Sequence, residues 1–204
     1  MANPKWENAF EKQDDRRRKK RMAVLRAGAW LFNQRGFERT TLDDIADALK
    51  VTKRTLYYYV SSKEEILVQC NIRAVEKIKE IVEDVFEAEG EALDLIEKLL
   101  WKYIYFLEDD MGVCLILSVK TQIPEADAAK LREGRRMIDH ALRTLIKQGI
   151  ADGSIAPCNP KLTAAAIFGA FNWVPYWNTG NNAIPLAEIA SNNIKFILKG
   201  LRAE

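Results

Sequence analysis

Residues 40–67 read TTLDDIADALKVTKRTLYYYVSSKEEIL, and this stretch decides the fold. Thr41, followed by Asp44 three residues later, predicts the start of a short helix. The apolar face of that helix is formed by Leu42, Ile45, Ala46 and Leu49. Thr52 predicts a second short helix that runs to about Tyr59, after a tight turn at residues 50–52. This is the spacing of a helix-turn-helix, whose second helix enters the major groove of DNA.

The second short helix is expected to present a basic and aromatic face. Leu56 and Val60 are four residues apart and should face the core, with Tyr59 beside them. The side chains left pointing outward together are Lys53, Arg54, Tyr57 and Tyr58. Cations in the first turn of a helix cost about 0.3–1 kcal/mol each unless an anion approaches. A DNA phosphate is such an anion; the alternative is a solvated basic face with incidental tyrosines.

A basic run lies ahead of the first predicted core helix, which begins near Met22 and ends at Gly36. Residues 16–26 contain no acid and seven cations: Arg16, Arg17, Arg18, Lys19, Lys20, Arg21 and Arg26. We expect a basic arm that reaches an adjacent groove or the DNA backbone; the alternative is a disordered, solubilising tail. The whole chain carries 31 Lys and Arg against 29 Asp and Glu. Its net charge of +2 therefore averages a basic end with an acidic middle.

The stretch from Val24 to Leu67 resembles the DNA-binding domain of the TetR family of bacterial transcriptional regulators. It carries that family's pattern of LF-x3-G, then TT-x3-IA, then VT-x3-LY-x-Y-x-x-SKE. The resemblance implies DNA contact by nine residues: Thr41, Thr52, Lys53, Arg54, Thr55, Tyr57, Tyr58, Tyr59 and Lys63. Lys50 and Arg54 stand where glycine is frequent in the family, and Val60 where phenylalanine is usual. The two cations are expected to change sequence preference and to leave DNA binding intact.

The rest of the chain also shows helical periodicity, and no run of alternating polarity is long enough for a strand. We therefore predict an all-α fold of about nine helices. A capping box at Ser62 and Glu65 opens a long helix. Later helices are expected near residues 91–108, 111–119, 125–152, 160–179 and 185–202. We expect residues 1–61 to hold the basic arm and the helix-turn-helix, and residues 62–204 to form an effector-binding and dimerisation domain.

The segment from Leu162 to Ala187 contains no charged residue, although it reads as most of a helix. A surface helix of a monomer should have a charged face, so this segment is expected to bury one side against a partner. The resemblance implies the same, since the last two helices of TetR regulators usually form a four-helix dimer interface. A two-fold dimer places two recognition helices roughly 34–36 Å apart on a palindromic operator. The alternative is a helix buried wholly within its own bundle.

Large side chains of the second half are numerous enough to line an apolar cavity among the helices. The candidates are Trp101, Tyr103, Tyr105, Phe106, Met111, Met137, Trp173 and Trp177, each of which could instead belong to the core. Arg135 lies on the apolar stripe of its helix and either forms a salt bridge inside the bundle or meets an anionic group of a ligand. The stretch Asn172-Trp173-x3-Trp177-x2-Gly180 resembles regulators of fatty-acid and steroid catabolism that respond to acyl-CoA thioesters, with Asn178 replacing a frequent tyrosine.

Composition limits the other classes of protein. Three cysteines lie far apart in the sequence, which excludes a disulfide framework and a cysteine zinc site, and we expect no metal and no cofactor. The N-terminal residues show no apolar signal segment, and no window is apolar for long enough to cross a membrane. We therefore expect a cytoplasmic protein without membrane contact. A single histidine and the lack of paired-carboxylate or phosphate-loop motifs argue against an enzyme.

The sequence therefore predicts a homodimeric, ligand-responsive transcriptional regulator, of which a repressor is the favoured form. Its expected partners are a double-stranded DNA operator and an apolar or acyl-CoA-like small molecule that releases it. Two alternatives remain at this point: an effector-free dimeric regulator whose bundle serves only for dimerisation, and, with less support, an all-α enzyme.

Overall fold

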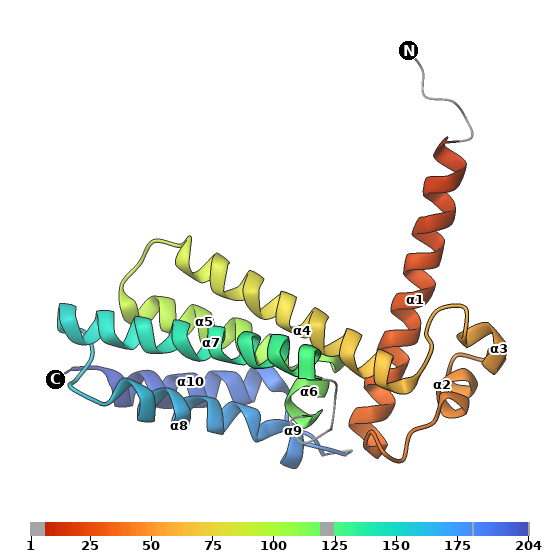
Figure 1. Ribbon diagram of the computed structural model, residues 1–204. Helices are drawn as coiled ribbons and strands as arrows, with labels where there is room; N and C mark the ends of the chain where they lie inside the picture. The colour runs from red at the N-terminus through yellow and green to blue at the C-terminus, as the bar shows by residue number, and fades with distance from the viewer. Residues whose placement is uncertain (1–6, 119–124, 181, 204) are drawn as a thin grey trace.

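The structure is a computed structural model that describes residues 7–118, 125–180 and 182–203. These residues form an all-α fold, as predicted (Figure 1). Its helices are α1 (Glu7–Arg35), α2 (Leu42–Ala48), α3 (Lys53–Leu56), α4 (Lys63–Phe86), α5 (Ala92–Phe106), α6 (Asp110–Leu117), α7 (Glu125–Asp152), α8 (Pro160–Asn172), α9 (Val174–Trp177) and α10 (Leu186–Leu201). In the part of the chain that is described, extended pairing is limited to a single bridge between Ile155 and Arg202. No helix in those ranges is both long and apolar enough to cross a bilayer.

A small head is built from the C-terminal half of α1 together with α2 and α3 (Figure 1). Its core is apolar and closed, because Leu25, Ile45 and Leu56 are completely buried. The start of α4 completes this core. A Cβ added at Gly28 of α1 would lie 2.5 Å from Cγ2 of Ile66 in α4. The two helices therefore cross more closely than a side chain at position 28 would allow.

The larger bundle consists of α4, α5, α7, α8 and α10, which run along the long dimension of the molecule in Figure 1. Helix α4 packs against α5 and α7, α5 packs against α7 and α10, and α7 packs against α8. The bundle core includes the buried residues Ile78, Ile96, Leu99, Leu100, Leu142 and Leu145. Helix α6 packs against both α1 and α4, so it lies between the head and the bundle.

Two of the predicted helices are shorter than expected. Helix α3 ends at Leu56, and the amides of Tyr58 and Tyr59 bond to the carbonyls three residues back, which tightens the chain into a turn. The single helix predicted for residues 160–179 is also wrong, because it breaks at Trp173 into α8 and the one-turn α9. Pro175 explains the break: it lacks an amide hydrogen and is tolerated only in the first turn of a helix.

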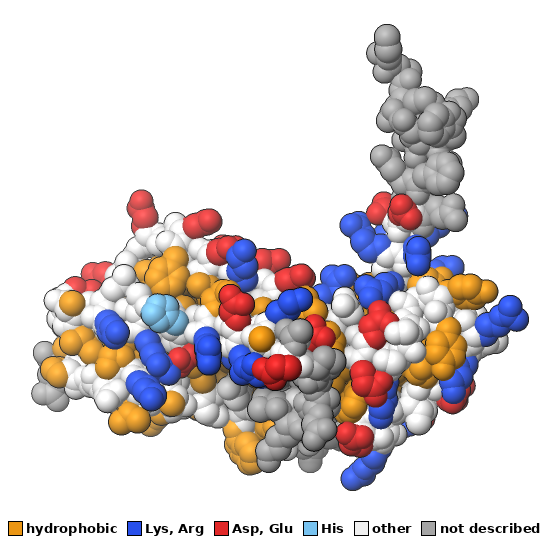
Figure 2. All heavy atoms as spheres, viewed as in Figure 1, with side chains coloured by type: hydrophobic (Ala, Val, Ile, Leu, Met, Phe, Trp, Pro, Cys, Tyr) orange, Lys and Arg blue, Asp and Glu red, His pale blue; other side chains and the backbone are white. Residues whose placement is uncertain are grey.

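The basic run at residues 16–26 lies inside α1, so the expected arm ahead of the first helix is instead a helical extension of it. Arginine and lysine are good helix formers, and Arg18 pairs with Asp15 at 3.0 Å one turn away. In Figure 1 the N-terminal part of α1 projects beyond the head. Figure 2 shows Lys and Arg side chains gathered where this projection meets the head, and Asp and Glu side chains along the edge formed by α4. Residues 16–26 therefore add a run of cations without acids to the head end of the molecule, although Lys and Arg side chains also lie on the bundle.

Candidate nucleic-acid interface

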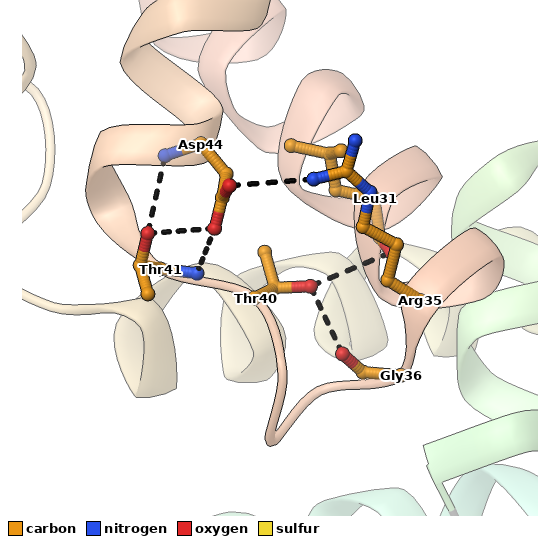
Figure 3. Close-up of polar contacts among 6 residues, drawn as sticks. All are labelled: Leu31, Arg35, Gly36, Thr40, Thr41 and Asp44. Carbon is orange, nitrogen blue, oxygen red and sulfur yellow. Dashed lines mark hydrogen bonds and ion pairs between the residues drawn. The ribbon is translucent and has the colours of Figure 1, made fainter.

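Helix α2 begins with a complete capping box, as the sequence predicted. The Thr41 hydroxyl accepts a hydrogen bond from the Asp44 amide at 3.2 Å, and the Asp44 carboxylate accepts one from the Thr41 amide at 2.8 Å (Figure 3). The hydrogen bonds from Thr41, helped by Arg35 at 3.3 Å, hold the pKa of Asp44 below its usual value. The buried Thr40 hydroxyl donates to the Gly36 carbonyl at 2.9 Å. The start of α2 is thus tied to the end of α1.

The turn between α2 and α3 contains a left-handed residue. Lys50 has a φ of +55°, and its amide donates to the Asp47 carbonyl at 3.0 Å, while the Val51 amide donates to the Ala46 carbonyl at 3.0 Å. A side chain in this conformation costs roughly 1–2 kcal/mol. Glycine would adopt it without that cost, which gives a physical reason why the TetR pattern has glycine at this position.

The predicted outward face of the α3 region is exposed, and the predicted inward residues are buried. Tyr57 and Tyr58 are 52% and 66% exposed, and Thr52, Lys53 and Arg54 also lie on the surface. Leu56 and Val60 are buried, as expected from their spacing. Tyr59 and Thr55 are half-buried. The surface formed by Thr52, Lys53, Arg54, Tyr57 and Tyr58 is called the recognition surface below.

One cation of the recognition surface already has a partner. Lys53 Nζ lies 2.7 Å from Asp43 Oδ2 on α2, and this hydrogen bond raises the pKa of Lys53. The carboxylate of Asp43 therefore partly offsets the unfavourable positive charge at the start of α3, and the sequence pattern did not predict this pair. Arg54 makes no ion pair with any residue of the described ranges. Thr52 caps α3, because its hydroxyl accepts from the Thr55 amide at 3.2 Å.

Lys63 holds the head together instead of extending freely toward solvent. Its Nζ donates to the carbonyls of Phe37 and Glu38 at 3.0 and 3.3 Å and lies 4.4 Å from the centre of the Phe37 ring. It therefore fixes the loop between α1 and α2 to the start of α4. Any DNA contact by Lys63 has to be made from this half-buried position.

Arg21, from the basic run, clamps the turn after α3. Its guanidinium donates to the Tyr59 carbonyl at 3.2 Å and to Glu65 at 2.9 Å. Burial favours the neutral form of Glu65, but hydrogen bonds from Ser61 and Arg21 outweigh it and lower the pKa of Glu65. Sequence reasoning missed this role, since the two partners are 44 positions apart. The remaining cations of residues 16–20 are exposed.

The residues predicted to line one effector cavity are divided among three hollows. Tyr103, Arg135 and Trp173 line a cavity of about 660 Å³ between α4, α5, α6, α7 and α8, called the bundle cavity below. A hollow of about 810 Å³ between α1, α4, α5 and α6 is lined by other members of the set: Tyr105, Phe106 and Met111. Trp101 lines a third hollow of about 460 Å³ beside α10. Met137 and Trp177 line none of these three.

Comparison with known proteins agrees with this arrangement. A family model described as "Bacterial regulatory proteins, tetR family" matches residues 24–70, and one described as "Tetracyclin repressor-like, C-terminal domain" matches residues 89–201. The chain belongs to the TetR family. It is therefore a transcriptional regulator with a helix-turn-helix that binds DNA, and not an enzyme.

Two curated relatives and one solved structure are similar to this TetR-family chain. The uncharacterized HTH-type transcriptional regulator YhgD of Bacillus subtilis (strain 168) is 23% identical over 182 residues, or 88% of this chain and 95% of YhgD. The negative transcriptional regulator IcaR of the biofilm operon icaADBC in Staphylococcus aureus (strain Newman) is 29% identical over 79 residues, or 39% of this chain and 42% of IcaR. The structure of AibR in complex with isovaleryl coenzyme A and operator DNA superposes with a TM-score of 0.75 at 20% identity, over 86% of this chain and 96% of AibR.

Proposed function

We propose that this TetR-family regulator is a repressor that binds a palindromic operator as a dimer and is released by an apolar or acyl-CoA-like small molecule. The recognition surface carries the proposal. It presents Arg54 and two exposed tyrosines on a scaffold whose helix starts are capped and whose turn is clamped by Arg21. Arginine and tyrosine side chains of this kind supply phosphate and base contacts in the major groove. The nine residues predicted to contact DNA stay assigned to that role.

Dimerisation through α8 and α10 is supported by large apolar side chains that they expose. Leu162 of α8 is 67% exposed and Phe196 of α10 is 78% exposed, and Trp173 at the end of α8 is 60% exposed. Both helices lie on the side of the bundle away from α4 in Figure 1. Exposed apolar surface of this kind is typical of contact with a partner. A two-fold dimer places its two recognition surfaces about one DNA turn apart, and a palindromic operator matches that symmetry.

Repression and release are supported by the relatives and by the position of α6. IcaR is a negative regulator, and AibR was solved with an acyl-CoA and operator DNA. In this chain α6 contributes Leu115, Ile116 and Leu117 to the bundle cavity. At its other end, the side-chain amide of Asn33 on α1 donates from Nδ2 to the Asp110 carbonyl of α6 at 2.8 Å. A molecule that occupies the cavity therefore shifts α6 and, through α6, the head.

Release requires that the effector bind more tightly to the conformation that does not fit the operator, because only differential affinity shifts the equilibrium. The effector-free alternative assigns the bundle to dimerisation alone and needs no cavity. A bundle cavity of about 660 Å³ weighs against it, since this volume lies within the range of small-molecule sites.

The test is binding of the full chain to the DNA upstream of its own gene, measured by fluorescence anisotropy over a series of salt concentrations. Specific binding should weaken steeply as salt rises, because cations that contact phosphates release counterions. Arg54→Ala should weaken binding about tenfold or more and leave the melting temperature unchanged. Lys147→Ala, which removes an exposed cation from α7, is the matched control and should bind as the unmodified chain does. Binding that is absent, or that does not depend on salt, would contradict the proposal.

A further inference from the structure

The bundle cavity has apolar walls and one cluster of polar groups. Ile78, Ile138 and Phe168 supply apolar wall, whereas Tyr103, Asn172 and Arg135 supply the polar cluster. The Tyr103 hydroxyl donates to Asn172 Oδ1 at 2.5 Å. Burial raises the pKa of Tyr103, so its phenol is neutral at ordinary pH. The cluster therefore contains one formal charge from these three residues, the guanidinium of Arg135.

The guanidinium of Arg135 lacks a counter-ion within the described ranges. One of its terminal nitrogens donates to the Leu115 carbonyl at 3.0 Å, and its buried Nε has no acceptor in that part of the chain. Asp139, one turn further along α7, also lines the cavity, but it pairs with Arg143 at 2.5 Å. Desolvation lowers the pKa of Arg135. Of the two roles left open by the sequence, a salt bridge inside the bundle is not formed by Arg135 among the residues that the structure describes.

The backbone holds Arg135 in this place. A Cβ added at Gly134 would lie 2.5 Å from Cγ2 and 3.0 Å from Cβ of Val75. Helices α4 and α7 therefore approach closely at Gly134, and the next side chain is fixed at the cavity wall. A half-buried cation is costly unless it is paired, and an arginine offers five donors in a fork that matches a carboxylate.

Building on the proposed function, we infer that the effector is an amphipathic organic acid whose carboxylate pairs with Arg135 and whose apolar body lies along Ile78, Ile138 and Phe168 in the bundle cavity. The carboxylate supplies the counter-ion that the cavity lacks, through charge-assisted hydrogen bonds. A neutral ester with the same apolar body leaves the guanidinium unpaired and is rejected on that ground. The acid also competes with the Leu115 carbonyl for the guanidinium of Arg135, so its binding weakens a hydrogen bond between α7 and α6.

The experiment compares acids with their own methyl esters, using the full chain without DNA. Three acids with different apolar bodies are used, each together with its methyl ester: decanoate, 1-naphthylacetate and cholanate. Decanoyl-CoA is added as a thioester. Dissociation constants are measured by calorimetry and stabilisation by thermal shift at pH 7. At least one acid should bind ten times or more tightly than its ester. Arg135→Met should abolish that preference, and Arg135→Lys should keep part of it. Arg136→Met, an exposed neighbour on α7, should keep all of it.

Three results would overturn the inference: no acid binds, every acid binds no better than its ester, or the acid preference survives in Arg135→Met. Tighter binding of decanoyl-CoA than of decanoate, unchanged in Arg135→Met, would also overturn it in favour of a thioester. The comparison of acid with ester in the unmodified chain needs no variant, so an unfolded Arg135→Met leaves the test decisive. These failures are separate from failure of the proposed function, which is the loss of salt-dependent operator binding in the absence of any ligand.

Discussion

In the head, α2 and α3 each begin at a threonine whose hydroxyl accepts a hydrogen bond from the amide three residues later, whereas in the bundle only some helices are capped in this way: α4 and α8 begin with a side-chain cap, and α5 and α10 begin without one. The short helices of the head would be marginal alone, and local hydrogen bonds define where they start. The longer helices of the bundle are held by apolar faces that pack on one another. The starts of the short head helices are therefore defined by nearby residues, and the bundle cavity by distant ones.

The head and the bundle also differ in how their cations are exposed. The cations of the recognition surface are exposed and close to solvent, where an anion can approach from outside. Arg135 is half-buried in the bundle, where an anion must enter a cavity to reach it. The same guanidinium chemistry thus suits a DNA backbone in one region and a small organic acid in the other.

The largest expected effect is a loss of stability in the head, caused by a substitution in its core. Leu56→Ala removes a completely buried side chain at the end of α3, and should lower the free energy of unfolding by about 2–5 kcal/mol. Urea unfolding followed by circular dichroism measures it. Tyr58→Ala, two residues away and 66% exposed, is the control and should change stability little while weakening operator binding. Equal losses of stability in the two variants would show that α3 is not anchored through Leu56.

A middle-sized effect should appear where the two regions meet. Asn33→Ala removes the hydrogen bond from α1 to the Asp110 carbonyl of α6, and should reduce the coupling between effector and operator by about 0.5–2 kcal/mol. The measurement is operator affinity with and without a saturating effector. The control is Asn192→Ala on α10, a substitution at an exposed site. Unchanged coupling in Asn33→Ala would mean that the head responds by another route.

The smallest expected effect is a gain of stability in the head. Lys50→Gly relieves the positive φ in the turn between α2 and α3, and should raise the free energy of unfolding by about 1 kcal/mol or less. Thermal and urea unfolding measure it, with Gly153→Ala as the opposite control, because Gly153 has a φ of +83° and should lose stability. A destabilised Lys50→Gly would indicate that the lysine side chain makes a contribution larger than its strain.

Much of the head could be predicted because its signals are short-range. The pair Thr41 and Asp44 was recognised from its spacing, and the burial of Leu56 and Val60 followed from helical periodicity. The partners of Lys63 and Arg21 could not be predicted, since they lie 26 and 44 residues away. The break at Trp173 could have been predicted from the sequence, because a proline such as Pro175 is tolerated only in the first turn of a helix.

The candidate cavity residues show most clearly what could not be predicted from the sequence. Trp101, Tyr105 and Arg135 were all predicted to line one cavity, yet they line three different hollows. Periodicity tells which side chains face inward, but it does not tell which neighbouring helix they meet. The bundle cavity depends on the packing of α7 against α4 and α8, and no local pattern encodes that packing.

The amino-acid sequence by itself determined the helical class, the starts of the head helices and the outward face of α3, because caps and 3.6-residue periodicity act within a few residues. The tertiary structure alone decided that Lys53 is paired with Asp43, that Lys63 supports a loop, and that Arg135 faces a cavity without a carboxylate partner in the described chain. Each of these depends on a contact between different elements of the fold, which local caps and periodicity do not specify.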